Sequence, residues 1–342
     1  MSKSRRLLAW YRDAARELPW RVEPRDPYRV LVSELMLQQT QVDRVVPRFD
    51  AFMVRFPTLA TLAEADVSKV LEAWSGLGYY RRARSLHRLA REVVARGSGL
   101  PQTAAELCAL PGIGPYTAAA VASLAFGAAE PVLDGNVMRV AARFLTMGEE
   151  ARRAPGRAKA LRWVRGLMEG AEPGRVNEAL MELGATVCTP RAPACPLCPL
   201  REECRARVEG RPEEHPPARR VREPEHLRWL AACAVSGRGR WLLRRVEAGA
   251  VLRGLWLPPF ADAGDGDVVA TALGLLPFPV DGGVSLPPVR HSITYRRISV
   301  VPVRVAVARE LPLPDGWAWA DPLVPGLPTS SLLAKLVRRA NK

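Results

Sequence analysis

The chain has 342 residues, a length that suits two domains of ordinary size. Apolar residues make up 48% and charged residues 25%, which is typical of a folded globular protein and argues against disorder. No run of 18 or more apolar residues occurs, which argues against a membrane span. The N-terminal segment lacks the apolar core and small-residue cleavage site of a secretion signal, so we expect a cytoplasmic protein.

The net charge is strongly positive. Fifty Lys and Arg residues against 35 Asp and Glu residues give +15, with excesses of +8 before residue 225 and +7 after it. A basic excess spread over both halves favours a polyanion partner, most often nucleic acid. Charge that serves solubility alone is an equally good explanation at this point.

Apolar residues recur at helical spacing through the first two hundred residues, most clearly over 66–74, 83–94, 103–110 and 116–126. Strand-like alternation is scarce in this part. The pattern therefore predicts an all-α domain over residues 1–207.

Residues 208–226 are almost devoid of apolar side chains and rich in proline, which predicts a linker. Short strands are predicted after it, over 227–235, 240–245 and 298–307, and a terminal helix over 331–339. We therefore expect a smaller α+β domain over residues 227–342.

A tight turn between two helices is predicted at LPGIGPYT, residues 110–117. Gly112 and Gly114 can both adopt positive φ, and Pro115 suits the first turn of the second helix. Free backbone N–H groups at that helix start would favour an anion such as a DNA phosphate. An ordinary helix–turn–helix corner is the alternative.

Four of the six cysteines follow the pattern C-x6-C-x2-C-x5-C: Cys188, Cys195, Cys198 and Cys204. A cytoplasmic chain will not keep such a group as disulfides, so metal ligation is the leading interpretation. The spacing leaves zinc and a [4Fe–4S] cluster open and favours the cluster, because long loops can surround a larger group. Cys108 and Cys233 are expected to pack in the core.

These motifs occur together with SELMLQQTQV (33–42), GLGYYRRAR (76–84) and LDGNVMR (133–139). In this order they resemble the helix–hairpin–helix DNA glycosylases of the endonuclease III type, and within them the MutY adenine DNA glycosylases. The resemblance covers roughly residues 5–206. It implies a catalytic domain over 1–207, one [4Fe–4S] cluster on the loop 188–204 and a Nudix-like C-terminal domain.

The resemblance also implies catalytic residues. Glu34 would protonate adenine as an acid whose pKa is raised by burial, and Asp134 would stay ionised and stabilise the oxocarbenium ion. Asn136 would orient Asp134 or a water molecule, and Tyr116 would hydrogen-bond to the acid. For isolated residues, a surface acid at Glu34 and a mere helix cap at Asp134 would be the better interpretations.

Further positions follow from the same resemblance. Gln39 and Tyr79 would fill the space around the base left unpaired by nucleotide flipping, and Arg81, Arg82 and Arg84 would meet phosphate or form a solvated helix face.

In the C-terminal domain, Thr294 and Tyr295 stand in the segment expected to read the damaged base. No Nudix hydrolase signature follows residue 226, which argues against nucleotide hydrolysis.

The sequence therefore predicts a DNA N-glycosylase that removes adenine mispaired with 8-oxoguanine or guanine in double-stranded DNA, acting as a monomer at the nucleoid. A lysine at the position of Tyr116 would permit strand cleavage, but no lysine lies between Lys69 and Lys159, so we expect a monofunctional enzyme. The alternatives are an endonuclease III-like enzyme acting on oxidised pyrimidines, and a non-catalytic iron–sulfur DNA-binding protein.

Overall fold

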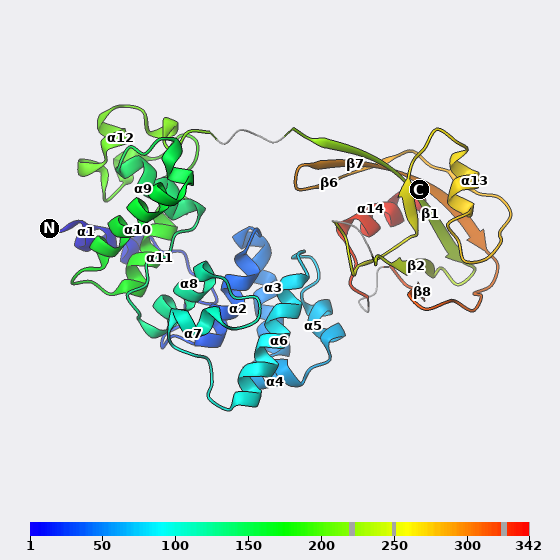
Figure 1. The fold of residues 1–342 in the computed structure, drawn as a ribbon, viewed down its shortest axis with the longest axis horizontal. Helices are drawn as coiled ribbons and strands as arrows, with labels where there is room; N and C mark the ends of the chain where they lie inside the picture. Colours follow the sequence, from blue (N-terminus) through cyan, green and yellow to red (C-terminus); the bar gives the residue numbers. More distant parts are fainter. Residues whose placement is uncertain (219–222, 248–250, 323–326, 342) are drawn as a thin grey trace. The chain divides into compact units, whose positions relative to one another are not determined.

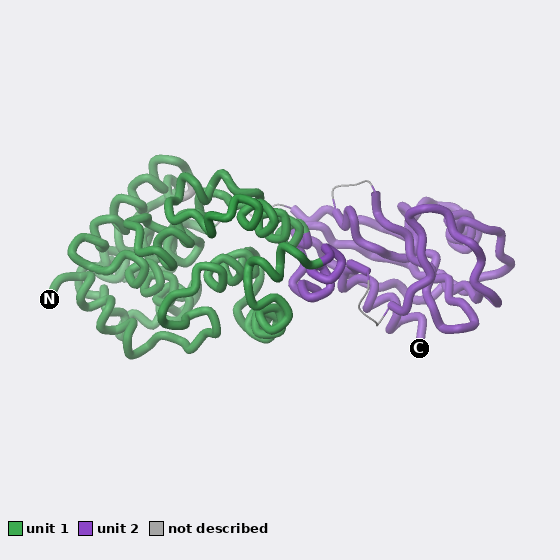
Figure 2. Tube along the Cα trace, turned by 90° about the horizontal axis from the view of Figure 1, so that it is seen from below, with its two compact units in different colours: residues 1–65, 81–220 green, residues 66–80, 221–342 purple. Residues whose placement is uncertain are grey.

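A computed structural model of the chain describes residues 1–218, 223–247, 251–322 and 327–341. Contacts between Cα atoms divide it into two compact units (Figure 2). The first contains residues 1–65 and 81–220, and the second contains residues 66–80 and 221–342. Of the predicted linker, residues 219–222 lie outside the described residues.

The first unit is helical throughout its described residues, as the sequence predicts (Figure 1). Its α-helices are α1 (Lys3–Ala14), α2 (Pro27–Leu37), α3 (Val42–Arg55), α4 (Leu59–Glu64), α6 (Arg81–Arg96), α7 (Ala104–Cys108), α8 (Pro115–Phe126), α9 (Gly135–Phe144), α10 (Ala154–Met168), α11 (Pro173–Thr186) and α12 (Arg205–Val208).

Local chemistry sets the ends of the helices that matter most. Asp26 caps the start of α2 by accepting hydrogen bonds from two backbone N–H groups, and Asp134 caps α9 by accepting from the Val137 N–H group. Pro115 occupies the first turn of α8, and Gly127 ends that helix with φ +72°. Side chains of α1, α9, α10 and α11 then form one apolar core.

The turn between α7 and α8 is as tight as its glycines predict. Gly112 has φ +79°, and a Cβ atom at this position would lie 2.3 Å from Cβ of Ser85, so both backbone freedom and close approach require glycine here. The prediction of positive φ at Gly114 is wrong: this residue has φ −95° because it is the extended N-cap of α8. Because the N-cap residue Gly114 has no side chain, the first backbone N–H groups of α8 receive no side-chain cap from it.

The second unit contains the helix α5 (Val67–Ala73) and an eight-stranded sheet with two helices. The strands are β1 (Glu225–Ser236), β2 (Trp241–Arg245), β3 (Trp256–Leu257), β4 (Phe260–Asp262), β5 (Val284–Ser285), β6 (Val289–Ile293), β7 (Arg296–Val307) and β8 (Trp317–Ala320). β1 runs parallel to β7, and the other pairs are antiparallel.

The helices α13 (Val268–Leu273) and α14 (Ser331–Ala340) cover opposite faces of this sheet (Figure 1). Trp229, Ala231 and Cys233 of β1 pack with α14, whereas Leu230 and Ala232 pack with α13, because successive side chains of a strand point to opposite faces. The predicted α+β class is confirmed, and Cys233 lies in the core as expected.

Two expectations differ from the structure. The first half of the predicted linker packs on the helical unit: the His215 carbonyl accepts from Arg143, and the Glu213 carboxylate accepts from the Ala192 N–H group. Cys108 is exposed and not in the core, because it ends the short helix α7 at the surface. Within the described residues, no helix has the length and apolarity needed to cross a membrane.

Candidate active site

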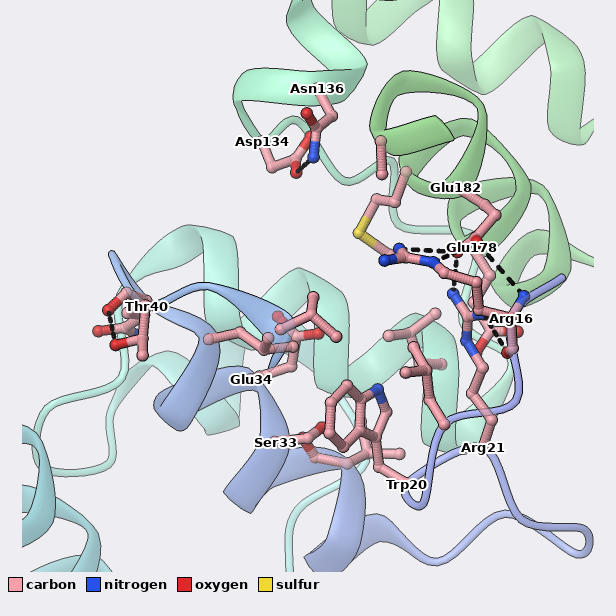
Figure 3. A pocket seen from close by; sticks show the side chains of 18 of the residues that line it. Arg16, Trp20, Arg21, Ser33, Glu34, Thr40, Asp134, Asn136, Glu178 and Glu182 are labelled. Carbon is pink, nitrogen blue, oxygen red and sulfur yellow. Dashed lines mark hydrogen bonds and ion pairs between the residues drawn. The ribbon is translucent and has the colours of Figure 1, made fainter. Parts of the chain in front are cut away.

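A cavity of about 480 Å³ opens in the helical unit where α2, α8, α11 and the start of α9 converge (Figure 3). Five residues singled out in the sequence line it: Glu34, Gln39, Tyr116, Asp134 and Asn136. These residues are up to 102 positions apart in the chain, and only the packing of the helices brings them together.

Glu34 projects from α2 into this cavity and is only 7% exposed. Its burial among apolar side chains raises the pKa of its carboxyl to about 7, since desolvation disfavours the charged form. A hydrogen bond from Tyr116 opposes this shift, and the negative charges of Asp134 and Glu178 add to it. Near neutral pH Glu34 is therefore able to hold a proton that it can give away.

Asp134 lies across the cavity from Glu34, at the first turn of α9 (Figure 3). Its carboxylate accepts from the Val137 N–H group at 2.6 Å and from the Asn136 amide at 3.2 Å. Burial raises the pKa of Asp134, while these hydrogen bonds and the charge of Arg139 work against that rise. The Asp134 carboxylate therefore caps α9, as one of its two interpretations predicts, and also lines the cavity.

Asn136 is itself held in place. Its side-chain oxygen accepts from the Arg139 guanidinium at 2.9 Å, and Arg139 also donates to the carbonyls of Gly184 and Cys188. A continuous set of hydrogen bonds therefore runs from Asp134 along α9 to the cysteine loop.

The wall of the cavity formed by α11 contains charged residues that the sequence analysis does not predict. Glu182 is buried there and accepts from Arg16 at 2.6 Å and from Arg21 at 2.8 Å, and Glu178 accepts from Arg25 at 2.7 Å. Burial raises the pKa of Glu182, but the two arginines outweigh it and leave that pKa below its usual value. The sequence signal for this wall is the spacing of the two acids, four residues apart on α11, together with the arginines concentrated in residues 16–25.

The prediction that Arg82 meets phosphate or lies on a solvated helix face is wrong. It is 9% exposed, and its guanidinium donates to the carbonyls of Leu35, Met36 and Gln38 at the end of α2. A cation at these carbonyls satisfies groups that a helix end leaves unpaired.

The Gln38 side chain donates to the Thr117 hydroxyl of α8 at 3.0 Å, so the loop after α2 is held from a second side. The next residue, Gln39, is exposed with φ +59°. The side chain predicted to face the unpaired base therefore projects from a fixed backbone.

Three other predicted DNA contacts lie in the second unit. Tyr79 has φ +48° and is 50% exposed. Thr294 and Tyr295 form the two-residue turn between β6 and β7, where Thr294 has φ +55° and Arg296 lies 4.6 Å from the centroid of the Tyr295 ring.

The four cysteines of the loop 188–204 line one small cavity together with Arg143 and Arg201. Arg143, from α9, donates to the Cys188 thiol at 3.3 Å and to the carbonyls of Thr189 and Pro190. Within the described residues, no three Cys, His, Asp or Glu side chains are close enough to hold a single metal ion.

The chain is similar to known proteins of base excision DNA repair. Residues 32–165 match the HhH-GPD superfamily of base excision DNA repair proteins. The adenine DNA glycosylase of Homo sapiens is 46% identical over 210 residues, 59% of this chain and 38% of that protein. The adenine DNA glycosylase of Mycolicibacterium smegmatis is 45% identical over 208 residues, 60% and 70% of the two chains. A solved thermostable thymine-DNA glycosylase is 28% identical, with a TM-score of 0.55, over 60% of this chain and 95% of that one.

The helical fold and the match over residues 32–165 indicate the helix–hairpin–helix class of base excision DNA repair proteins. The chain belongs to the adenine DNA glycosylase family, which confirms the resemblance found in the sequence. The matched segment spans about two fifths of the length of the animal and plant relatives.

The two roles of Asp134 can be separated by substitution. Asp134→Asn keeps an acceptor for the Val137 N–H group, so we expect the free energy of unfolding to change by only a few tenths of a kcal/mol, whereas Asp134→Ala should lower it by about 1 kcal/mol. Urea unfolding followed by circular dichroism measures both. Equal losses for Asn and Ala would contradict the capping role.

Proposed function

We propose that the chain is a monofunctional adenine DNA glycosylase that removes adenine mispaired with 8-oxoguanine or guanine, acting as a monomer on double-stranded DNA in base excision repair. The observation that carries the proposal is the pair of carboxyl groups on opposite sides of one cavity, buried at Glu34 and half-buried at Asp134, in different surroundings. Burial raises the pKa of both groups, but Glu34 has one opposing hydrogen bond, from Tyr116, whereas the Val137 and Asn136 donors and the charge of Arg139 all oppose the rise at Asp134.

In this mechanism the neutral Glu34 donates its proton toward N7 of an adenine held in the cavity, which makes the base a better leaving group. Asp134 covers the face of the sugar opposite the departing base and stabilises the oxocarbenium ion that develops at C1′. Water then adds to the face that the base has left, which gives retention. Asn136 keeps Asp134 in place through its amide, and Tyr116 hydrogen-bonds to Glu34 and supplies no amine for strand cleavage.

Adenine must leave the duplex to reach this cavity, which costs a few kcal/mol of stacking. Gln39 offers an amide at the exposed edge of the cavity, and Tyr79 offers a flat ring, to occupy the space beside the base left behind. The unpaired N–H groups at Gly114 and the close turn at Gly112 suit a phosphate contact at the start of α8.

The cysteine loop fits one [4Fe–4S] cluster, held by Cys188, Cys195, Cys198 and Cys204. Four thiols that line one cavity, with long loops between the outer cysteines that can surround a larger group, support this choice over zinc. When bound, such a cluster ties the loop into one conformation and can carry an electron. The loop's own carbonyls then receive Arg139 and Arg143 in fixed positions.

The C-terminal unit would recognise the base opposite adenine, as a Nudix-like domain without hydrolase activity. The Thr294–Tyr295 turn places an exposed hydroxyl and an aromatic ring at the end of a hairpin, where they can contact a damaged purine. A DNA substrate places the protein at the nucleoid.

A single-turnover assay tests the proposed activity. With a duplex that carries adenine opposite 8-oxoguanine, we expect free adenine to be released and strand cleavage to appear only after alkaline treatment. Cleavage without alkali would refute the monofunctional activity, and release of an oxidised pyrimidine in place of adenine would show an endonuclease III-like enzyme.

The acid role of Glu34 makes the rate depend on pH. Because its pKa is about 7, its protonated form is lost as pH rises through 7, and the single-turnover rate should fall toward tenfold per pH unit above that point. Glu34→Gln should lower the rate by at least about 10²-fold and leave DNA affinity intact. A flat pH profile from 6 to 9, or full activity of Glu34→Gln, would contradict the assignment.

Metal analysis of the purified chain tests the cluster. We expect about four iron atoms and about four acid-labile sulfides per chain, with broad absorbance near 400 nm. Cys198→Ser should lose this absorbance, whereas Cys108→Ser, at the exposed cysteine outside the loop, should keep it. One zinc per chain would refute the proposal.

A further inference from the structure

One face of the ribbon formed by β1, β7 and β6 carries a basic patch that the proposed chemistry does not use. The strand register places His226 of β1, Arg297 of β7 and Ser292 of β6 in one row. The next row holds Arg228, Ser299 and Arg290 in the same strand order. We call these six residues the arginine grid.

The arginine grid lies at the uncovered end of the face that α13 packs against. Further along β1, Leu230 and Ala232 on this face are buried with α13, whereas Arg228 and His226 are exposed. Arg290, Arg297 and Ser292 are exposed too, and Ser299 is half-buried. These polar side chains therefore face solvent together.

The opposite face of the same ribbon is mostly buried and carries no such row of unpaired arginines among the described residues. Leu227, His291 and Ile298 on that face pack toward α14 or are buried, and the ion pair of Arg296 with Glu225 is also there. Within the described residues, no ion pair neutralises Arg228, Arg290 or Arg297. The sheet register has thus collected three guanidinium groups, and no acid, on one side.

Geometry and charge fit an extended polyanion. Strands about 4.8 Å apart, with about 6.6 Å between alternate residues, put Arg228 and Arg290 about 10 Å apart across β7. Arg297 is one row further along β7, about 8 Å from each of them. Guanidinium groups bind phosphate through paired N–H donors, and the two serine hydroxyls add further donors of the kind that contact phosphates. A regular row of single negative charges matches this spacing better than one compact anion.

We propose that the arginine grid binds the sugar–phosphate backbone of the DNA strand next to the base that the Thr294–Tyr295 turn meets. The proposal rests on the proposed action on duplex DNA. The turn continues the same hairpin directly beyond the row of Ser292 and Arg297, so one rigid hairpin supplies both contacts. The backbone contact gives affinity without sequence preference, and the turn gives selectivity.

The salt dependence of binding tests this surface. In the Glu34→Gln background, which keeps the mispair intact, the full chain is titrated into a labelled duplex with adenine opposite 8-oxoguanine at several salt concentrations. The triple variant Arg228→Gln, Arg290→Gln, Arg297→Gln should reduce the slope of log K against log [salt] by about 2 to 3, since each lost phosphate contact removes about 0.9.

A matched control removes the same charge from the same unit. Arg238, Arg309 and Arg338 are exposed, and the first two stand at the other ends of β1 and β7. Their triple change to Gln should leave the slope within about 0.5 of the parent value, because no phosphate contact is lost. If the control lowers the slope as much as the grid variant, or if neither lowers it, the proposal is overturned.

Two further readouts keep the test decisive. If the grid triple variant does not fold by circular dichroism, the three single variants should each lower the slope by about 0.9, and unchanged slopes would overturn the proposal. Adenine release by the unaltered chain is measured separately. A lower slope without adenine release would therefore refute the proposed function and leave the DNA surface standing.

Discussion

The Glu34 carboxyl is withdrawn from water on an apolar helix, and this desolvation governs what the cavity can do. Ionising both carboxyl groups that face one cavity costs free energy, because the two negative charges repel each other. The group with fewer hydrogen-bond donors therefore becomes the neutral one. Asp134 has the backbone N–H group of Val137 and the Asn136 amide, whereas Glu34 has mainly the Tyr116 phenol. The proposed roles of Glu34 as acid and Asp134 as anion thus follow from hydrogen-bond donors at the start of α9.

The helices that carry these groups are fixed at their ends by ionic and polar contacts. α2 is held by Asp26 at its start and by the buried Arg82 guanidinium at its end, so Glu34 sits on a helix that cannot fray. α9 has Asp134 at its start, and Arg139 and Arg143 reach from it to carbonyls of the cysteine loop. A distortion of that loop would therefore be felt at the carboxylate through one rigid helix.

Sequence patterns predicted what depends on neighbours along the chain. The α7–α8 turn, Pro115 in its first-turn position and the Asp134 cap are local features and were found where expected. Arg82 was misjudged, because an arginine in a basic run is usually solvated and only α2, more than 40 residues earlier, supplies its carbonyl partners. The ion pairs of Glu182 are not predicted for the same reason. Its partners, Arg16 and Arg21, are more than 160 residues earlier in the chain.

Backbone strain gives an independent argument about the positions proposed to contact DNA. Among the described residues, six that are not glycine have positive φ, and three of them are Gln39, Tyr79 and Thr294. This conformation costs such residues about 1 to 3 kcal/mol, and glycine would adopt it without that cost. The other three stand in loops with no proposed contact, so strain alone does not define a site. At Gln39 and Tyr79 the strained residue also has an exposed side chain that points away from the core. Glycine would stabilise the fold more at these positions. The presence of a larger residue there therefore favours a role for its side chain.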